Sequence, residues 1–187
     1  VRSTLVHGLT HVLQDQNCGV GDRMEKLQDV PEGQPSGTEA SVLRAIIEGD
    51  AERVEGLYRE SLGPRERAAL DRERGDKVER ADRKLRKVPE IVVTLLTSPY
   101  ALGGGLVQAS AIDGGNDTID DLLRDPPVSD KVLLDPLREL AGESEYTEVK
   151  VPRTRDGEKR FGSGELGALT WYLMMSERLP VADALQA

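Results

Sequence analysis

Apolar side chains recur at helical spacing along most of this chain, and that periodicity restricts it to a mainly α-helical fold. Near the start, Leu5, Leu9, Val12 and Leu13 follow the i, i+4, i+7, i+8 pattern of one helix face. Aromatic residues make up only 3% of the sequence, so aliphatic side chains must build most of the core. The 187 residues are enough for one sizeable domain with such a core.

Glycine and proline divide the helical patterns into segments. The longer helices are expected at residues 2–16, 39–61, 64–87 and 90–97, and shorter ones at 118–124, 131–140, 166–175 and after Pro180. Thr38 is a suitable N-cap for the second helix, and the glycines at 103–105 and 114–115 predict turns. One short β segment is expected at Tyr146–Val151, which alternates and is rich in β-branched residues. We therefore expect a single, mainly α-helical domain over 1–187.

The charge balance and the apolar runs exclude several classes of partner. A net charge of −9 and a pI of about 4.9 offer no basic surface to nucleic acid or to an anionic membrane. The apolar runs, such as Ile91–Leu96, are far shorter than the roughly 20 residues of a membrane span. The single cysteine, Cys18, excludes an internal disulfide and any multi-cysteine metal site. We expect no nucleic-acid partner and no membrane span, and the oligomeric state stays open.

The only two histidines of the chain, His7 and His11, are four residues apart on the first predicted helix. That spacing stacks two imidazoles on one helix face, as in the H-E-x-x-H motif, where they bind one tetrahedral cation and the Glu is the general base. Gly8 stands in the place of that Glu. A catalytic zinc site needs a third protein ligand, and Glu48 is a candidate because it follows an apolar pair on the second predicted helix.

Glu48 has competitors for the third ligand position. Glu52 and Glu55 lie on nearly the same helix face, at i+4 and i+7. A carboxylate beside a buried apolar stripe is costly unless a cation compensates it, which favours Glu48. Asp50 and Glu52 lie within a turn of Glu48 and are candidates to orient the histidines as hydrogen-bond partners.

Several segments resemble a family of zincin-type metallopeptidase-like proteins, mostly from actinobacteria. HGLTHVLQDQ is similar to the HELTHALQDQ helix of that family, and LRAIIEGDA is similar to its second motif. Tyr100-Ala-Leu-Gly, Asp113-Gly-Gly-Asn and LGALTWYL also resemble family features, so the likeness spans nearly the whole chain. The resemblance implies a gluzincin-like Zn²⁺ site with His7, His11 and Glu48 as ligands. It also implies a peptide or protein substrate and an extracellular or membrane-anchored protein.

The chain departs from this family at three points. Gly8 replaces the general base, so we expect zinc binding to survive and peptidase activity to be crippled or absent. The zincin fold has a small sheet upstream of the histidine helix, and family members continue beyond the last helix. We therefore expect a zincin-like helical core fragment, truncated at both ends and without the upstream sheet. Two other functions stay open: a non-enzymatic acidic helical binding module, and a zinc-binding pseudopeptidase that captures peptides without cutting them.

Overall fold

A computed structural model describes residues 2–29, 37–142, 153–159 and 164–185. Helices account for 78% of the described residues and no strand occurs among them, which confirms the mainly α-helical fold. The strand predicted at Tyr146–Val151 lies outside the described residues. The elements are, in chain order, α1 (Arg2–Cys18), α2 (Val20–Gln28), α3 (Glu39–Ser61), α4 (Pro64–Leu85), α5 (Glu90–Arg124), the 3-10 helix η1 (Asp130–Leu133), α6 (Pro136–Leu140), α7 (Ala168–Ser176) and α8 (Val181–Ala184).

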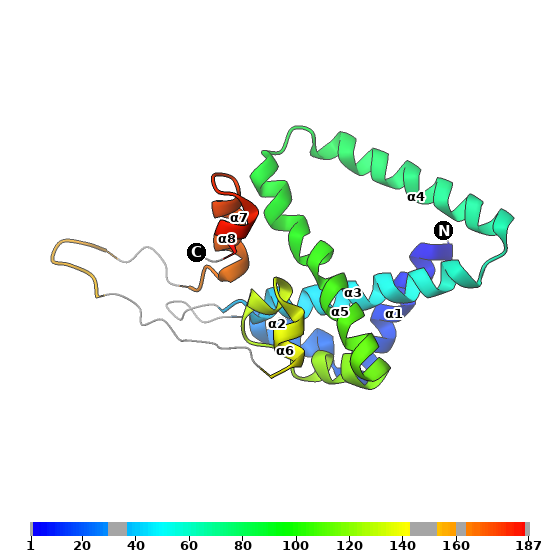
Figure 1. The fold of residues 1–187 in the computed structure, drawn as a ribbon, viewed down its shortest axis with the longest axis horizontal. Coiled ribbons are helices and arrows are strands. Elements are labelled where there is room, and N and C mark those ends of the chain that lie inside the picture. The colour runs from blue at the N-terminus through cyan, green and yellow to red at the C-terminus, as the bar shows by residue number, and fades with distance from the viewer. Residues whose placement is uncertain (1, 30–36, 143–152, 160–163, 186–187) are drawn as a thin grey trace.

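Helix α3 lies at the centre of the fold and packs against α5 and α1 (Figure 1). Its inward face carries Val42, Leu43 and Ile46, which are fully buried. They share one core cluster with Leu106 and Val107 of α5. The core is therefore built from aliphatic side chains, as the scarcity of aromatic residues predicts.

The crossing of α3 and α5 is close because both helices have glycine there. A Cβ added to Gly49 of α3 would lie 2.6 Å from the carbonyl carbon of Gly103. A Cβ added to Gly103 of α5 would lie 2.0 Å from the backbone oxygen of Ala45. Glycine costs about 1 kcal/mol relative to alanine inside a helix, and here that cost is offset by the backbone contact it permits.

The glycines at 103–105 lie inside a helix, so the turn predicted there is wrong. The helix expected at 90–97 continues through them as α5 to Arg124. Packing of α5 on α3 decides the conformation at Gly103 against its local preference for a turn. The chain leaves helical geometry only at Gly115, where φ is 72°, and α5 bends at that residue.

Among the described residues, α5 is the one helix long and apolar enough to cross a membrane by length and composition. Core helices of soluble proteins pass the same test, so the finding alone does not assign a span. Ile91–Leu96, which is too short to cross a membrane by itself, is part of this longer helix. The absence of a span therefore stays a prediction.

Helix α1 forms where it was predicted but turns its polar side towards α3. The four residues of its apolar stripe are 49–58% exposed, whereas Thr10 and Gln14 are buried. His7 and His11 share the inward side with these two residues, since all four follow helical spacing. Periodicity identified the two faces of this helix correctly but did not show which of them faces the core.

Thr38 precedes α3 as predicted, but its side chain does not cap that helix. Its hydroxyl donates to the Val128 carbonyl at 3.1 Å and accepts from the Asp130 N–H at 3.2 Å. The buried Asp130 accepts a 2.7 Å hydrogen bond from the Ala168 N–H at the start of α7. Burial raises the pKa of Asp130, because the charged carboxylate loses solvation. These bonds tie the start of α3 to η1 and α7.

Helix α4 spans from the end of α3 to the start of α5 and stays away from the core for most of its length (Figure 1). Leu70 is its one buried residue. Ion pairs at i, i+4 join Lys77 to Glu73 and Arg83 to Glu79, a pattern typical of a solvated helix.

The remaining segments differ from the prediction mainly in their boundaries. The helix expected at 131–140 is divided into η1 and α6, with Pro136 in the first position of the second piece. The helix expected at 166–175 is α7, and α8 follows Pro180. The sequence did not predict α2. This helix begins directly after Gly19, whose backbone is in the left-handed region with φ 62°.

Candidate metal centre

The two helices that carry the predicted ligands run antiparallel. Ser3, near the start of α1, contacts Glu55 towards the end of α3, while Gln14 contacts the Ile47 carbonyl about two turns earlier in α3. This arrangement brings the histidine face of α1 onto the Glu48 face of α3.

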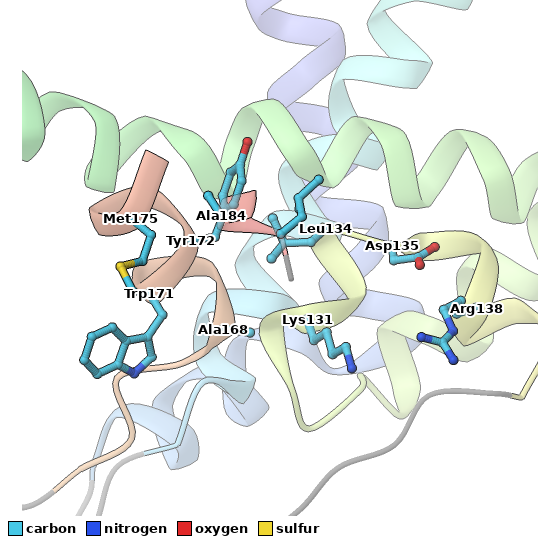
Figure 2. Close-up of a pocket in the computed structure, with 10 residues that line it drawn as sticks. Lys131, Leu134, Asp135, Arg138, Ala168, Trp171, Tyr172, Met175 and Ala184 are labelled. Atoms are coloured by element: carbon cyan, nitrogen blue, oxygen red, sulfur yellow. The ribbon is translucent and has the colours of Figure 1, made fainter. Parts of the chain in front are cut away.

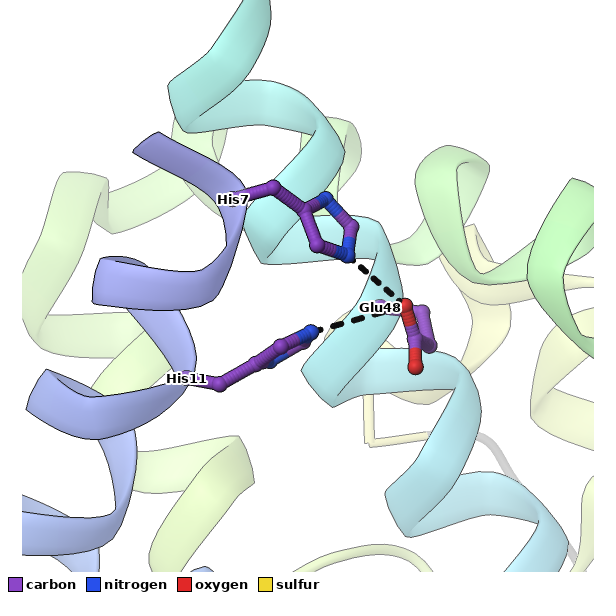
Figure 3. A group of neighbouring side chains, drawn as sticks. All are labelled: His7, His11 and Glu48. Atoms are coloured by element: carbon purple, nitrogen blue, oxygen red, sulfur yellow. Dashed lines mark ion pairs between the residues drawn. The ribbon is translucent and has the colours of Figure 1, made fainter. Parts of the chain in front are cut away.

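His7 and His11 project from α1 towards Glu48 (Figure 3). The Nε2 atom of His7 is 3.2 Å from Glu48 Oε2, and the Nε2 atom of His11 is 3.7 Å from the same oxygen. The two imidazole rings lie edge to face with centroids 4.6 Å apart. One ligand atom from each residue lies within 4.8 Å of the other two, so the group could hold a metal ion. The three side chains are 24–32% exposed and therefore accessible to water.

The Nδ1 atoms of both histidines also face oxygen atoms. His7 Nδ1 is 3.6 Å from Glu55 Oε2, and the other oxygen of Glu55 accepts a hydrogen bond from the Ser3 hydroxyl. His11 Nδ1 is 3.0 Å from the side-chain oxygen of Gln14. In metal sites a histidine usually binds the ion through one ring nitrogen and donates the other N–H to such an acceptor.

The predicted third ligand and its competitors occupy different places. Glu48 is the carboxylate that faces both imidazoles, whereas Glu55 reaches only the Nδ1 side of His7. Glu52 is exposed, and no described contact joins it to either histidine. The structure therefore brings together His7, His11 and Glu48 and leaves Glu52 apart. Glu55 lies on the Nδ1 side of His7, away from Glu48.

Asp50 reaches His11 only through Gln14. Its Oδ2 accepts a 2.9 Å hydrogen bond from the Gln14 amide, and its Oδ1 accepts two from Arg53. Sequence reasoning did not identify Gln14. Its position three residues after His11 and seven after His7, on the same helix face, was the available signal.

Gly8, where the motif has its general base, is exposed on α1. A Cβ added there would have no atom within 4 Å. The first carbon of a side chain at this position would therefore have room.

One pocket borders the histidine group, and a larger pocket lies away from it. One of about 200 Å³ borders His7 and Glu55 and is otherwise lined by α1 and α4 residues, including Arg74 and Lys77. A larger one of about 760 Å³ lies between η1, α6, α7 and α8 and contains none of the candidate ligands (Figure 2).

Cys18 ends α1 and is half-buried against the core cluster, apart from the histidine group. Burial raises the pKa of its thiol, because a thiolate there would be poorly solvated. The residue is therefore a packing side chain in this fold.

Comparisons with protein-family models, with curated proteins and with solved structures find no match. The likeness to zincin-type proteins therefore stays an expectation drawn from the sequence motifs.

Proposed function

We propose that this chain binds one zinc ion through His7, His11 and Glu48, in a zincin-type site that lacks the general base. The observation that carries the proposal is the convergence of two imidazole Nε2 atoms on one carboxylate oxygen. Two ligand atoms that are each about 2.1 Å from a tetrahedral zinc ion are about 3.4 Å apart. The two nitrogen–oxygen distances, 3.2 and 3.7 Å, bracket that value.

The chemistry of the three side chains favours zinc over the hard cations. Calcium and magnesium take oxygen ligands, whereas two imidazoles and one carboxylate are the protein ligands of a common class of catalytic zinc site. Such sites keep a fourth position for water or substrate. The partial exposure of all three side chains supports access of a small molecule to that position.

Peptide hydrolysis by the chain as written is expected to be weak or absent. Bound zinc would supply Lewis-acid polarisation of a substrate carbonyl and a more acidic water. At position 8, Gly8 offers no side chain to accept the proton or pass it to the leaving amine. General acid–base catalysis is typically worth about 10²–10⁴-fold. The proposed function is therefore zinc binding at a peptidase-like site, with the hydrolytic step impaired.

Elemental analysis of the purified chain tests this proposal, with His11→Ala and Glu48→Gln as ligand variants. Glu52→Gln is the matched control, since it removes the same charge from an exposed position on the same helix. We expect about one zinc per chain in the parent and the control, and loss of zinc in both ligand variants. Zinc that is absent from the parent, or that survives in both ligand variants, would overturn the assignment and favour a non-enzymatic binding module.

A further inference from the structure

We propose that Gln14 is a positioning residue: it holds His11 in the tautomer with the proton on Nδ1, so that Nε2 presents its lone pair towards Glu48. The consequence for metal affinity rests on the proposed zinc site. The tautomer itself does not, because it is a property of the metal-free protein.

The orientation of the Gln14 amide follows from its two other partners. Its nitrogen lies 3.0 Å from the Ile47 carbonyl oxygen and 2.9 Å from Asp50 Oδ2. A carbonyl and a carboxylate can only accept, so the group facing them must be the NH₂. The Gln14 oxygen therefore faces His11.

An amide oxygen can only accept a hydrogen bond, so the His11 ring must donate to it. His11 Nδ1 is 3.0 Å from this oxygen, an ordinary hydrogen-bond length. Nδ1 therefore carries the proton in neutral His11, and Nε2 is left unprotonated. In the alternative tautomer an Nε2–H would point towards Glu48 and would have to be lost before a metal could bind there.

Gln14 is buried and is held by hydrogen bonds to partners on α3. Gln14 is only 4% exposed and Asp50 only 7% exposed, and a buried polar group that loses its partner is costly. Asp50 is held in turn by two hydrogen bonds from Arg53, which also donates a 2.9 Å bond to Asn116. Asn116 directly follows the bend of α5 at Gly115. His11 is therefore supported by a polar chain that extends from α1 across α3 to α5.

Gln14→Met tests this role, because methionine has a similar length and offers no amide. Gln16→Met is the matched control, since Gln16 is exposed on the same helix. The first measurement is the tautomer of His11 by ¹⁵N NMR of the imidazole in metal-free protein at about pH 8.5, where histidine is ordinarily neutral. We expect the Nδ1–H form in the parent and in Gln16→Met, and a mixture or the Nε2–H form in Gln14→Met.

The second measurement is zinc affinity by competition with a chelator. We expect Gln14→Met to bind zinc about 10–100-fold more weakly than Gln16→Met, the usual effect of removing a partner behind a metal-binding histidine. An Nε2–H tautomer in the parent would overturn the proposal even if Gln14→Met does not fold. Equal tautomers and equal affinities in the two folded variants would also overturn it. If the parent shows the Nδ1–H form, lost in Gln14→Met, but binds no zinc, the positioning role stands and the proposed zinc site fails.

Discussion

The substitution Gly103→Ala provides a direct test of the close crossing between α3 and α5. The added methyl would lie 2.0 Å from the Ala45 oxygen and 2.6 Å from its carbonyl carbon. Both atoms belong to the backbone of the neighbouring helix, so no side chain can rotate to relieve the overlap. The two helices would have to separate, and the packing of Leu106 and Val107 on α3 would loosen with them.

The expected magnitude follows from two opposing terms. Overpacking a well-packed core costs typically about 1–3 kcal/mol, and an overlap with backbone belongs at the upper end of that range. Alanine gains about 1 kcal/mol over glycine in helix propensity. Gly103→Ala should therefore destabilise the fold by about 2 kcal/mol, the difference of these two estimates.

Gly105→Ala is the matched control two residues along the same helix. Gly105 is exposed, and a Cβ added there would have no atom within 4 Å. This variant should be stabilised by about 1 kcal/mol, since only the propensity term acts. The propensity gain is the same in both variants, so the difference between them, about 3 kcal/mol, isolates the steric cost.

Urea unfolding followed by far-ultraviolet circular dichroism measures both variants, because the protein is mainly helical. We expect the midpoint to fall for Gly103→Ala and to rise for Gly105→Ala, with similar m-values. Equal stability of the two variants would refute the close crossing, since the methyl at position 103 would then have met no obstacle.

Two further substitutions test the site and the buried carboxylate. Gly8→Glu should be accommodated, because a Cβ added at position 8 has no atom within 4 Å. In a fluorogenic peptide assay the zinc-loaded variant should hydrolyse peptide about 10²–10⁴-fold faster than the zinc-loaded parent. A zinc-loaded variant that cleaves nothing would show that the missing base is not the cause of inactivity. Burial raises the pKa of Asp130, so its contribution to stability is greatest below the ordinary carboxyl range of about 4 and falls as pH rises through the raised value. Asp130→Asn should abolish this loss of stability with rising pH, and melting temperatures of the parent and the variant between about pH 4 and 7 measure it. If the melting temperatures of parent and variant depend on pH in the same way, Asp130 does not titrate as described.

The candidate site was predictable from sequence to the extent that it depends on local spacing. The i, i+4 separation puts His7 and His11 on one face of any helix that contains them. The apolar residues before Glu48 indicated how that carboxylate would be oriented. These residues favoured Glu48 over Glu52, but the contact of Glu48 with both imidazoles depends on the antiparallel placement of α1 on α3, which local spacing does not encode.

The course of α5 could not be predicted locally, for a physical reason. Three consecutive glycines and a preceding Ser-Pro pair favour a turn when judged by propensity alone. The backbone of Ala45 lies against Gly103, and that contact needs a residue without a side chain. Glycine here serves packing between helices, and only the partner helix makes that visible.

The orientation of α1 connects the fold to the candidate site. A helix usually buries its apolar face, but α1 exposes its four aliphatic residues and turns His7, His11 and Gln14 towards α3. The contacts that join this side of α1 to α3 are therefore mainly polar: the hydrogen bonds of Gln14 and the approach of both histidines to Glu48. A metal ion held by two residues of α1 and one of α3 would add bonds between the same two helices. Binding of that ion and docking of α1 would then be thermodynamically coupled, since each stabilises the state that the other requires.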